Sequence, residues 1–179
     1  MVGLTLFAGL TLSVPALATN IPVVHYDPPK IRFQDQSGTP SIEDVTISKD
    51  GQEYVFTTPS GSGQAPGSEP GCTDSVNTMY RCPVPGIQKI VANLGELDDT
   101  ASIDLGSKAA KVKQILRGQA GEDEITGGTG PQRIKGGSDD DTLIGGPGPD
   151  RINGGGGNDI CEGGPGNDTI KNCEPLVPG

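Results

Sequence analysis

The sequence predicts an all-β fold in which a small strand-rich N-terminal cap is followed by a parallel β-solenoid. The first indication is composition: 32% of the 179 residues are apolar and 3% aromatic, with 29 glycines and no tryptophan. Such a chain has too little apolar material for an ordinary globular core. The second is a nine-residue period in the C-terminal part, which is typical of repeat architectures. The third is an Asp-Gly pair between two short alternating runs, which predicts an upstream hairpin.

The period comprises six consecutive nonapeptides between residues 118 and 171, each a variant of G-G-x-G-x-D-x-U-x in which U is apolar. The eighth positions are Ile125, Ile134, Leu143, Ile152, Cys161 and Ile170. The sixth positions are Asp123, Gln132, Asp141, Asp150, Asp159 and Asp168. Residues 94–102 read as a weaker copy, and residues 109–117 keep only the apolar eighth position, Leu116. The array therefore begins imperfectly near residue 90.

The repeat chemistry indicates an oxygen-rich cation site. Glycine supplies the positive φ angles of a tight curl, and its missing Cβ lets neighbouring loops approach closely. The last three residues of each nonapeptide form a short strand whose apolar residue points inward. Two nonapeptides make one turn, so alternate loops lie on the same edge and bring carboxylates and loop carbonyls around a shared cavity. Such ligands select Ca²⁺ over zinc or copper.

The array resembles the haemolysin-type, or RTX, calcium-binding nonapeptide repeat, closely over residues 118–171 and loosely over 90–117. In its setting it looks like the secreted calcium-binding repeat proteins of Gram-positive or actinobacterial type. The resemblance implies a parallel β-roll that binds Ca²⁺. It places Asp123, Asp141 and Asp159 on one edge, and Gln132, Asp150 and Asp168 on the other. Three good sites are expected, at 123/141, 141/159 and 150/168. A weak one is expected at 132/150, which has a single carboxylate.

Charge excludes some partners. The net charge is −10, and residues 118–174 hold eleven acidic and four basic side chains. Such a segment repels nucleic acid and attracts cations.

The N-terminal part reads as strands joined by loops. If Asp50 and Gly51 form the turn, Ile47 faces Tyr54 and Val45 faces Phe56, which leaves one apolar side. Residues 60–71 have loop composition. Residues 87–94 read as a strand that leads into the array.

The first residues resemble a secretory leader. An apolar stretch over residues 4–18 ends in Ala16-Leu17-Ala18, the small-x-small pattern of a cleavage site. A membrane helix is the alternative, but it needs about 20 apolar residues, and this stretch contains Pro15. No later segment is apolar enough to cross a bilayer. The expected organisation is a signal peptide at 1–18, a β-rich cap region at 19–88, calcium-binding repeats at 89–174 and a tail at 175–179, in a secreted, extracellular protein.

Four cysteines form two close pairs in sequence, Cys72/Cys82 and Cys161/Cys173. In an oxidising compartment two local disulfides are the default, although other pairings stay possible. Zinc is the rival interpretation. Neither pair has C-x-x-C spacing, and the one histidine, His25, is distant in sequence.

The sequence contains no G-x-S-x-G, H-E-x-x-H or P-loop motif, and a single histidine leaves little scope for a catalytic triad. We therefore expect a non-enzymatic, secreted calcium-binding module, structural or binding in role, that folds on Ca²⁺ outside the cell. Calcium ions are the expected partner, with an unidentified surface or matrix component. The alternative is a small secreted hydrolase stabilised by the repeats.

Overall fold

The computed structural model describes residues 23–27, 30–34, 44–50, 53–57, 73–74, 79–83, 87–106 and 111–174. The expected signal peptide, the loop at 60–71, Cys72 and the tail at 175–179 lie outside the described residues. Every regular element in the described part is a strand, and no helix there is long and apolar enough to cross a membrane. The predicted all-β class is therefore confirmed.

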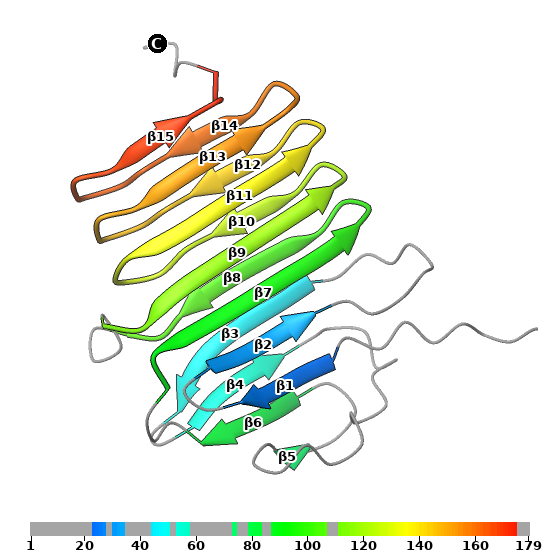
Figure 1. Cartoon of the computed structure of the whole chain (residues 1–179), viewed down its shortest axis with the longest axis vertical. Helices are drawn as coiled ribbons and strands as arrows, with labels where there is room; N and C mark the ends of the chain where they lie inside the picture. The colour runs from blue at the N-terminus through cyan, green and yellow to red at the C-terminus, as the bar shows by residue number, and fades with distance from the viewer. Residues whose placement is uncertain are drawn as a thin grey trace, which may run out of the picture.

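The strands form two sheets (Figure 1). Sheet A has the order β1-β2-β7-β9-β11-β13-β15, and sheet B has the order β14-β12-β10-β8-β3-β4-β6-β5. Sheet A comprises β1 (Val23–Asp27), β2 (Lys30–Gln34), β7 (Lys89–Glu96), β9 (Lys113–Ala120), β11 (Gln132–Ser138), β13 (Arg151–Gly155) and β15 (Thr169–Lys171). Sheet B comprises β3 (Asp44–Asp50), β4 (Glu53–Thr57), β5 (Thr73–Asp74), β6 (Met79–Pro83), β8 (Thr100–Asp104), β10 (Glu124–Thr126), β12 (Thr142–Ile144) and β14 (Ile160–Glu162).

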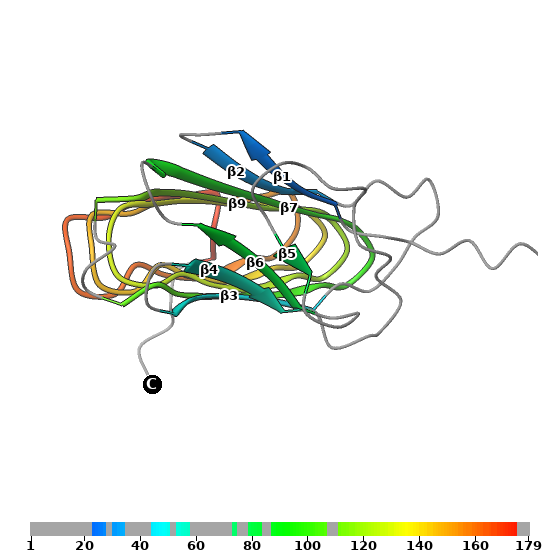
Figure 2. The same cartoon turned by 90° about the horizontal axis from the view of Figure 1, so that it is seen from below.

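From β7 onward the chain winds as a parallel β-roll. Successive strands alternate between the two sheets, which lie over one another as flat layers (Figure 2). In sheet A, Ile134 pairs with Ile152, and in sheet B, Ile125 pairs with Leu143. Both pairs are 18 residues apart, so two nonapeptides complete one turn, as the period predicts. The sheets are open at their ends and close no barrel.

The N-terminal strands extend both sheets of the roll. Strand β2 pairs in parallel with β7, and β3 pairs in parallel with β8. The strands beyond them, β1 on sheet A and β4, β6 and β5 on sheet B, are antiparallel. The first turn of the roll is therefore not an open edge, because it continues into paired strands.

The β3–β4 hairpin forms as expected, but its predicted pairing is wrong. Ile47 pairs with Phe56 and Lys49 with Tyr54, so that Asp50 pairs with Glu53. Arg81 of β6 contacts both residues of this last pair, because its Nη1 lies 3.0 Å from Asp50 Oδ2 and 3.2 Å from Glu53 Oε2. The predicted partner and the observed one differ by two residues, and side chains alternate with a period of two, so the apolar face stays the same.

The hydrophobic core narrows toward the C-terminus. Near the cap it contains the large side chains of Tyr54, Phe56, Ile47, Ile90 and Leu94, all at most 1% exposed. Further along, each half-turn contributes one inward residue. These residues are Leu116, Ile125, Ile134, Leu143, Ile152 and Cys161. The eighth-position column therefore builds the core as predicted, but Ile170 in the last turn is 43% exposed.

A disulfide closes the C-terminal end. Cys161 of β14 is bonded to Cys173, and Cys161 is buried. Beside it, the backbone N–H of Glu174 donates to Asp159 O at 2.7 Å, and Ile160 bridges to Glu174 in parallel. One of the two expected disulfides is confirmed. Cys82 is also disulfide-bonded, but the other expected member of its pair, Cys72, lies outside the described residues.

Candidate metal centre

One edge of the roll carries a ladder of buried aspartates. The backbone N–H of Asp123 donates to Asp141 Oδ1, and that of Asp141 donates to Asp159 Oδ1, each at 3.0 Å. All three side chains are at most 2% exposed. The structure thus brings together the three sixth-position aspartates that the resemblance to the RTX repeat assigns to one edge.

The opposite edge repeats the arrangement with one change of chemistry. The backbone N–H of Gln132 donates to Asp150 Oδ1 at 2.8 Å, and that of Asp150 donates to Asp168 Oδ1 at 2.9 Å. Gln132 and Asp150 are buried, whereas Asp168, in the last turn, is partly exposed. All five aspartates singled out from the sequence therefore occupy equivalent places.

The second carboxylate oxygens of these ladders are buried without hydrogen bonds. This holds for Oδ2 of Asp123, Asp141, Asp150 and Asp159. A buried charged oxygen without a partner is costly, and such a group in a native fold requires an explanation. The nearby groups supply no N–H or O–H donor to them within the part of the chain that the structure describes.

Each unpartnered oxygen points over the first glycine of its own repeat. A Cβ built on Gly136 would overlap Asp141 Oδ2 and lie 2.8 Å from the carbonyl oxygen of Gly154 in the next turn. The same convergence of a carboxylate and a carbonyl oxygen occurs above Gly118 and Gly145. Glycine is therefore required at these positions by the close approach of oxygens. These converging oxygens are the ligand type that Ca²⁺ prefers.

Burial disfavours charge on the ladder aspartates. Desolvation raises the pKa of Asp123 to about 8, with a contribution from the neighbouring charges of Asp99 and Asp141. It raises the pKa of Asp141 to about 6, and raises the pKa of Asp150 above its ordinary value. A bound cation removes this penalty, because an opposite charge favours the ionised carboxylate.

Glutamine changes the chemistry of the second edge near the cap. Gln132 Nε2 donates to Gly128 O at 2.8 Å, and Gln114 Nε2 donates to Thr129 O at 3.1 Å. Gln114 pairs with Gln132 in register and is fully buried. In this turn the two side-chain amides thus donate to loop carbonyls. In the turns with aspartate, by contrast, the Oδ2 atoms are buried without a donor.

The structure adds Asp99 to the first ladder. Its backbone N–H donates to Asp123 Oδ1 at 3.1 Å, and the side chain is 2% exposed. The weak copy at 94–102 places Asp99 sixth, but a spacing of 24 residues to Asp123, in place of 18, obscured the relationship. This loop repeats the curl, with φ of 134° at Gly95 and 89° at Leu97, but its first position is Leu94, which carries a Cβ where the repeats have glycine.

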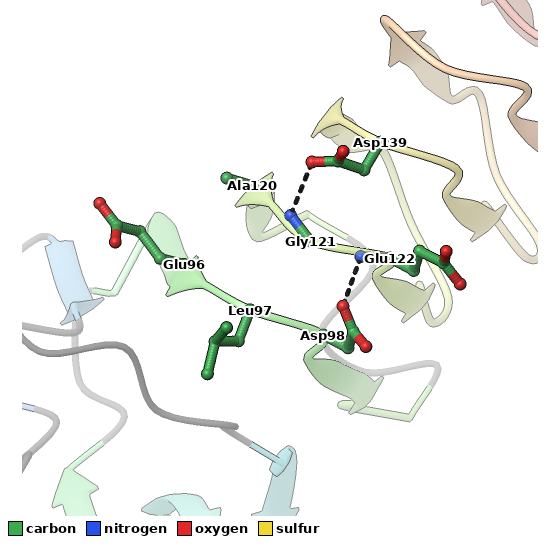
Figure 3. Close-up of a pocket in the computed structure, with 7 residues that line it drawn as sticks. All are labelled: Glu96, Leu97, Asp98, Ala120, Gly121, Glu122 and Asp139. Atoms are coloured by element: carbon green, nitrogen blue, oxygen red, sulfur yellow. Dashed lines mark hydrogen bonds between the residues drawn. The ribbon is translucent and has the colours of Figure 1, made fainter.

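A second set of carboxylates on the first edge binds backbone N–H groups (Figure 3). Asp98 Oδ1 accepts from Glu122 N at 2.9 Å, and Asp139 Oδ2 accepts from Gly121 N at 3.2 Å. They line a shallow pocket of about 390 Å³ together with Glu96. Asp139 replaces a glycine of the repeat and adopts a φ of 77°. These exposed residues connect successive loops and are distinct from the buried ladders.

The ladders do not form a conventional side-chain metal cluster. No three histidine, cysteine, aspartate or glutamate side chains converge on one point within the described residues. The spacing explains this, because each turn contributes one buried carboxylate per edge and the remaining oxygens are backbone carbonyls. The arrangement suits a hard cation bound by mixed oxygen ligands.

Comparison with known proteins agrees with this geometry. The family model of the RTX calcium-binding nonapeptide repeat matches the chain in four copies, over residues 114–131 and 135–170. No curated protein and no solved structure matches the chain significantly. The matched residues include the ladder residues of both edges between Gln114 and Asp168, with the exception of Gln132. The chain therefore contains RTX calcium-binding nonapeptide repeats at residues 114–131 and 135–170.

Proposed function

We propose that this protein is a secreted calcium-binding β-roll module whose repeat region folds when it binds Ca²⁺ outside the cell. The observation that carries the proposal is the set of buried Oδ2 atoms without hydrogen bonds, those of Asp123, Asp141 and Asp159 on the first edge and that of Asp150 on the second. Each of them converges with a loop carbonyl from the next turn. The confirmed disulfide between Cys161 and Cys173 is compatible with an oxidising compartment.

The proposed ligands are the carboxylates of Asp123, Asp141, Asp159, Asp150 and Asp168 together with first-position carbonyls such as Gly136 O and Gly154 O. Calcium supplies positive charge and flexible oxygen coordination. We propose three strong sites, at 123/141, 141/159 and 150/168, because each lies between two carboxylates. The place between Gln132 and Asp150 is weak, since the Gln132 amide already donates to a loop carbonyl.

Dependence on calcium follows from the distribution of the core. The turns near the cap bury aromatic and large aliphatic side chains, whereas the last turns bury a single aliphatic residue or cysteine per half-turn. Apolar burial therefore contributes least where the buried carboxylates are most numerous. Metal binding and folding are then coupled in the C-terminal turns. The RTX repeat is a calcium-binding structural repeat, and the proposal gives the protein no catalytic role.

The test is calorimetric titration of the mature chain with Ca²⁺, followed in parallel by circular dichroism. The proposal expects about three strong equivalents with millimolar or tighter dissociation constants, and a gain of β structure over the same calcium range. Mg²⁺ at equal concentration serves as the control, because it demands stricter octahedral geometry. A chain that takes up no calcium, or takes it up with no change in the spectrum, contradicts the proposal.

A further inference from the structure

The outer face of sheet A carries every basic residue of the six complete nonapeptides at residues 118–171. Arg133 and Arg151 pair in register on the adjacent strands β11 and β13. Thr169 on β15 pairs with Arg151 and completes this first row. A second row, two residues further along the same three strands, consists of Lys135, Asn153 and Lys171. The four basic side chains are all exposed. They are the four cations of residues 118–174, so the acidic array gathers its positive charge on one face.

These cations have no partner among the described residues. None of the four side chains makes a hydrogen bond or an ion pair there, whereas Arg117 on the same face donates to Asn93 Oδ1 at 3.0 Å. Like charges directly opposite on neighbouring strands repel each other. Arg133 and Arg151 are placed in this way in a protein with a net charge of −10. Their position disfavours the isolated protein and favours a bound anion.

A shallow groove of about 280 Å³ runs between the two rows of side chains. It is lined by Arg133, Lys135, Arg151, Asn153, Thr169 and Lys171. Neighbouring strands lie about 4.8 Å apart, and residues two apart on a strand lie about 6.7 Å apart. The groove therefore crosses the strands along the axis of the roll, with a positive charge at intervals and amide and hydroxyl groups between.

We infer that this face binds a linear anionic polysaccharide, with its sulfate, phosphate or carboxylate groups against the arginines and lysines. The inference rests on the proposed function, because calcium binding is what orders β11, β13 and β15 into one face. Arginine recognises such anions through paired N–H donors, and lysine does so as a point charge. Asn153 and Thr169 offer hydrogen bonds to sugar hydroxyl groups.

The other faces of the protein argue against different occupants. A second copy would have to present acids, but the exposed carboxylates of the repeat strands of sheet B do not lie opposite one another, because Glu124 pairs with Thr142 and Glu162 pairs with Ile144. They form no continuous acidic row. A nucleic acid duplex is wider than a single polymer, so it would also approach the exposed acids of the first edge, such as Glu122, Asp139 and Asp140, and be repelled.

The experiment measures binding of the full mature protein to heparin in excess Ca²⁺, with neutral dextran as the reference polymer. Arg133→Gln/Arg151→Gln is expected to weaken heparin binding by about tenfold or more, and added salt to weaken it further. The matched control, Glu124→Gln/Glu162→Gln, changes two charges on sheet B and should leave binding unchanged. If net charge alone governed binding, this control would bind more tightly than the unmodified protein.

Calcium titration of each variant separates the two proposals. Normal calcium uptake with lost heparin binding in Arg133→Gln/Arg151→Gln supports the inference. Normal calcium uptake without binding of any anionic polymer overturns the inference alone, as does undiminished binding by this variant. Equal or tighter binding of duplex DNA, or self-association through this face in sedimentation, also overturns it. Absence of calcium uptake by the unmodified protein overturns the proposed function and this inference together.

Discussion

The backbone N–H of Asp123 donates to Asp141 Oδ1 across one full turn of the roll, and Asp141 Oδ2 stays buried without a hydrogen bond. The two oxygens of one carboxylate therefore have different roles. Oδ1 connects successive loops through the backbone, whereas Oδ2 is available for a cation. This division recurs at Asp150 and Asp159, so the same residue column both aligns the turns and supplies the charge that a metal neutralises.

Asp141→Asn should weaken calcium binding because it touches two proposed sites while keeping an oxygen that can accept from Asp123 N. The expected result is a loss of up to two strong equivalents, or affinities lower by about tenfold or more. Asp140→Asn is the matched control, since Asp140 is exposed and accepts only from the backbone N–H of Asn158 at 2.7 Å. Calorimetry of both variants checks this. Equal calcium uptake by the two would show that the ladder is not the site.

Gly136→Ala should disrupt the roll locally, because the added Cβ overlaps Asp141 Oδ2 and approaches Gly154 O. Overpacking of this kind costs about 1–3 kcal/mol. Gly156→Ala is the control, because a Cβ there meets nothing within 4 Å. It should be neutral or stabilising by about 0.4–1 kcal/mol. Thermal unfolding in calcium measures both, and a smaller loss for Gly136→Ala than for Gly156→Ala would contradict the geometry.

Calcium affinity should fall as the pH is lowered from about 8.5 to 5.5, because protons compete at Asp123, with a pKa of about 8, and Asp141, with a pKa of about 6. Without calcium the sign reverses. These folded-state pKa values exceed the ordinary value of 3.8. The contribution of these two groups to the stability of the metal-free protein is therefore fully present below pH 3.8. It is lost as the pH rises through the folded-state pKa values of about 6 for Asp141 and about 8 for Asp123.

Denaturant unfolding in chelator at pH 5 and pH 8.5, with calorimetry in buffers of different ionisation enthalpy, tests both signs. The metal-free protein should resist denaturant better at pH 5, and calcium binding near pH 7 should release protons. Calcium affinities that do not change with pH would show that Asp123 and Asp141 are not protonated in competition with the metal.

Gln132→Asp should strengthen the weak site beside Asp150. The substitution removes the amide that donates to Gly128 O and adds a second carboxylate. Calorimetry should then detect one further strong calcium equivalent. Gln132→Asn keeps a neutral amide and should leave the stoichiometry of the unmodified protein. An unchanged calcium count in Gln132→Asp would mean that the sixth-position residue does not control this site.

The sequence contained enough to predict the roll and its ladders, because both depend on local periodicity. The nine-residue spacing, together with the resemblance to the RTX repeat, predicts that Asp123, Asp141 and Asp159 share an edge, and the structure places them there. The apolar eighth column predicts the core in the same way. These features need no knowledge of distant contacts.

Features that depend on tertiary pairing could not be read in advance. The parallel pairing of β2 with β7 and of β3 with β8 joins segments more than 50 residues apart in sequence. The end of the β3–β4 hairpin is bridged by Arg81, which lies on a third strand. The place of Asp99 is a further case, because its backbone N–H donates to Asp123 Oδ1 although 24 residues, in place of 18, separate the two.

The central claim is that bound calcium, more than apolar burial, holds the C-terminal turns in their folded shape. Hydrogen exchange of the full mature protein in excess calcium and in excess chelator tests it most directly. We expect the amides of β11 to β15 to be protected in calcium and to exchange rapidly in chelator, while those of β3, β4 and β7 change least. Equal protection of β11 to β15 in the two conditions would contradict the claim.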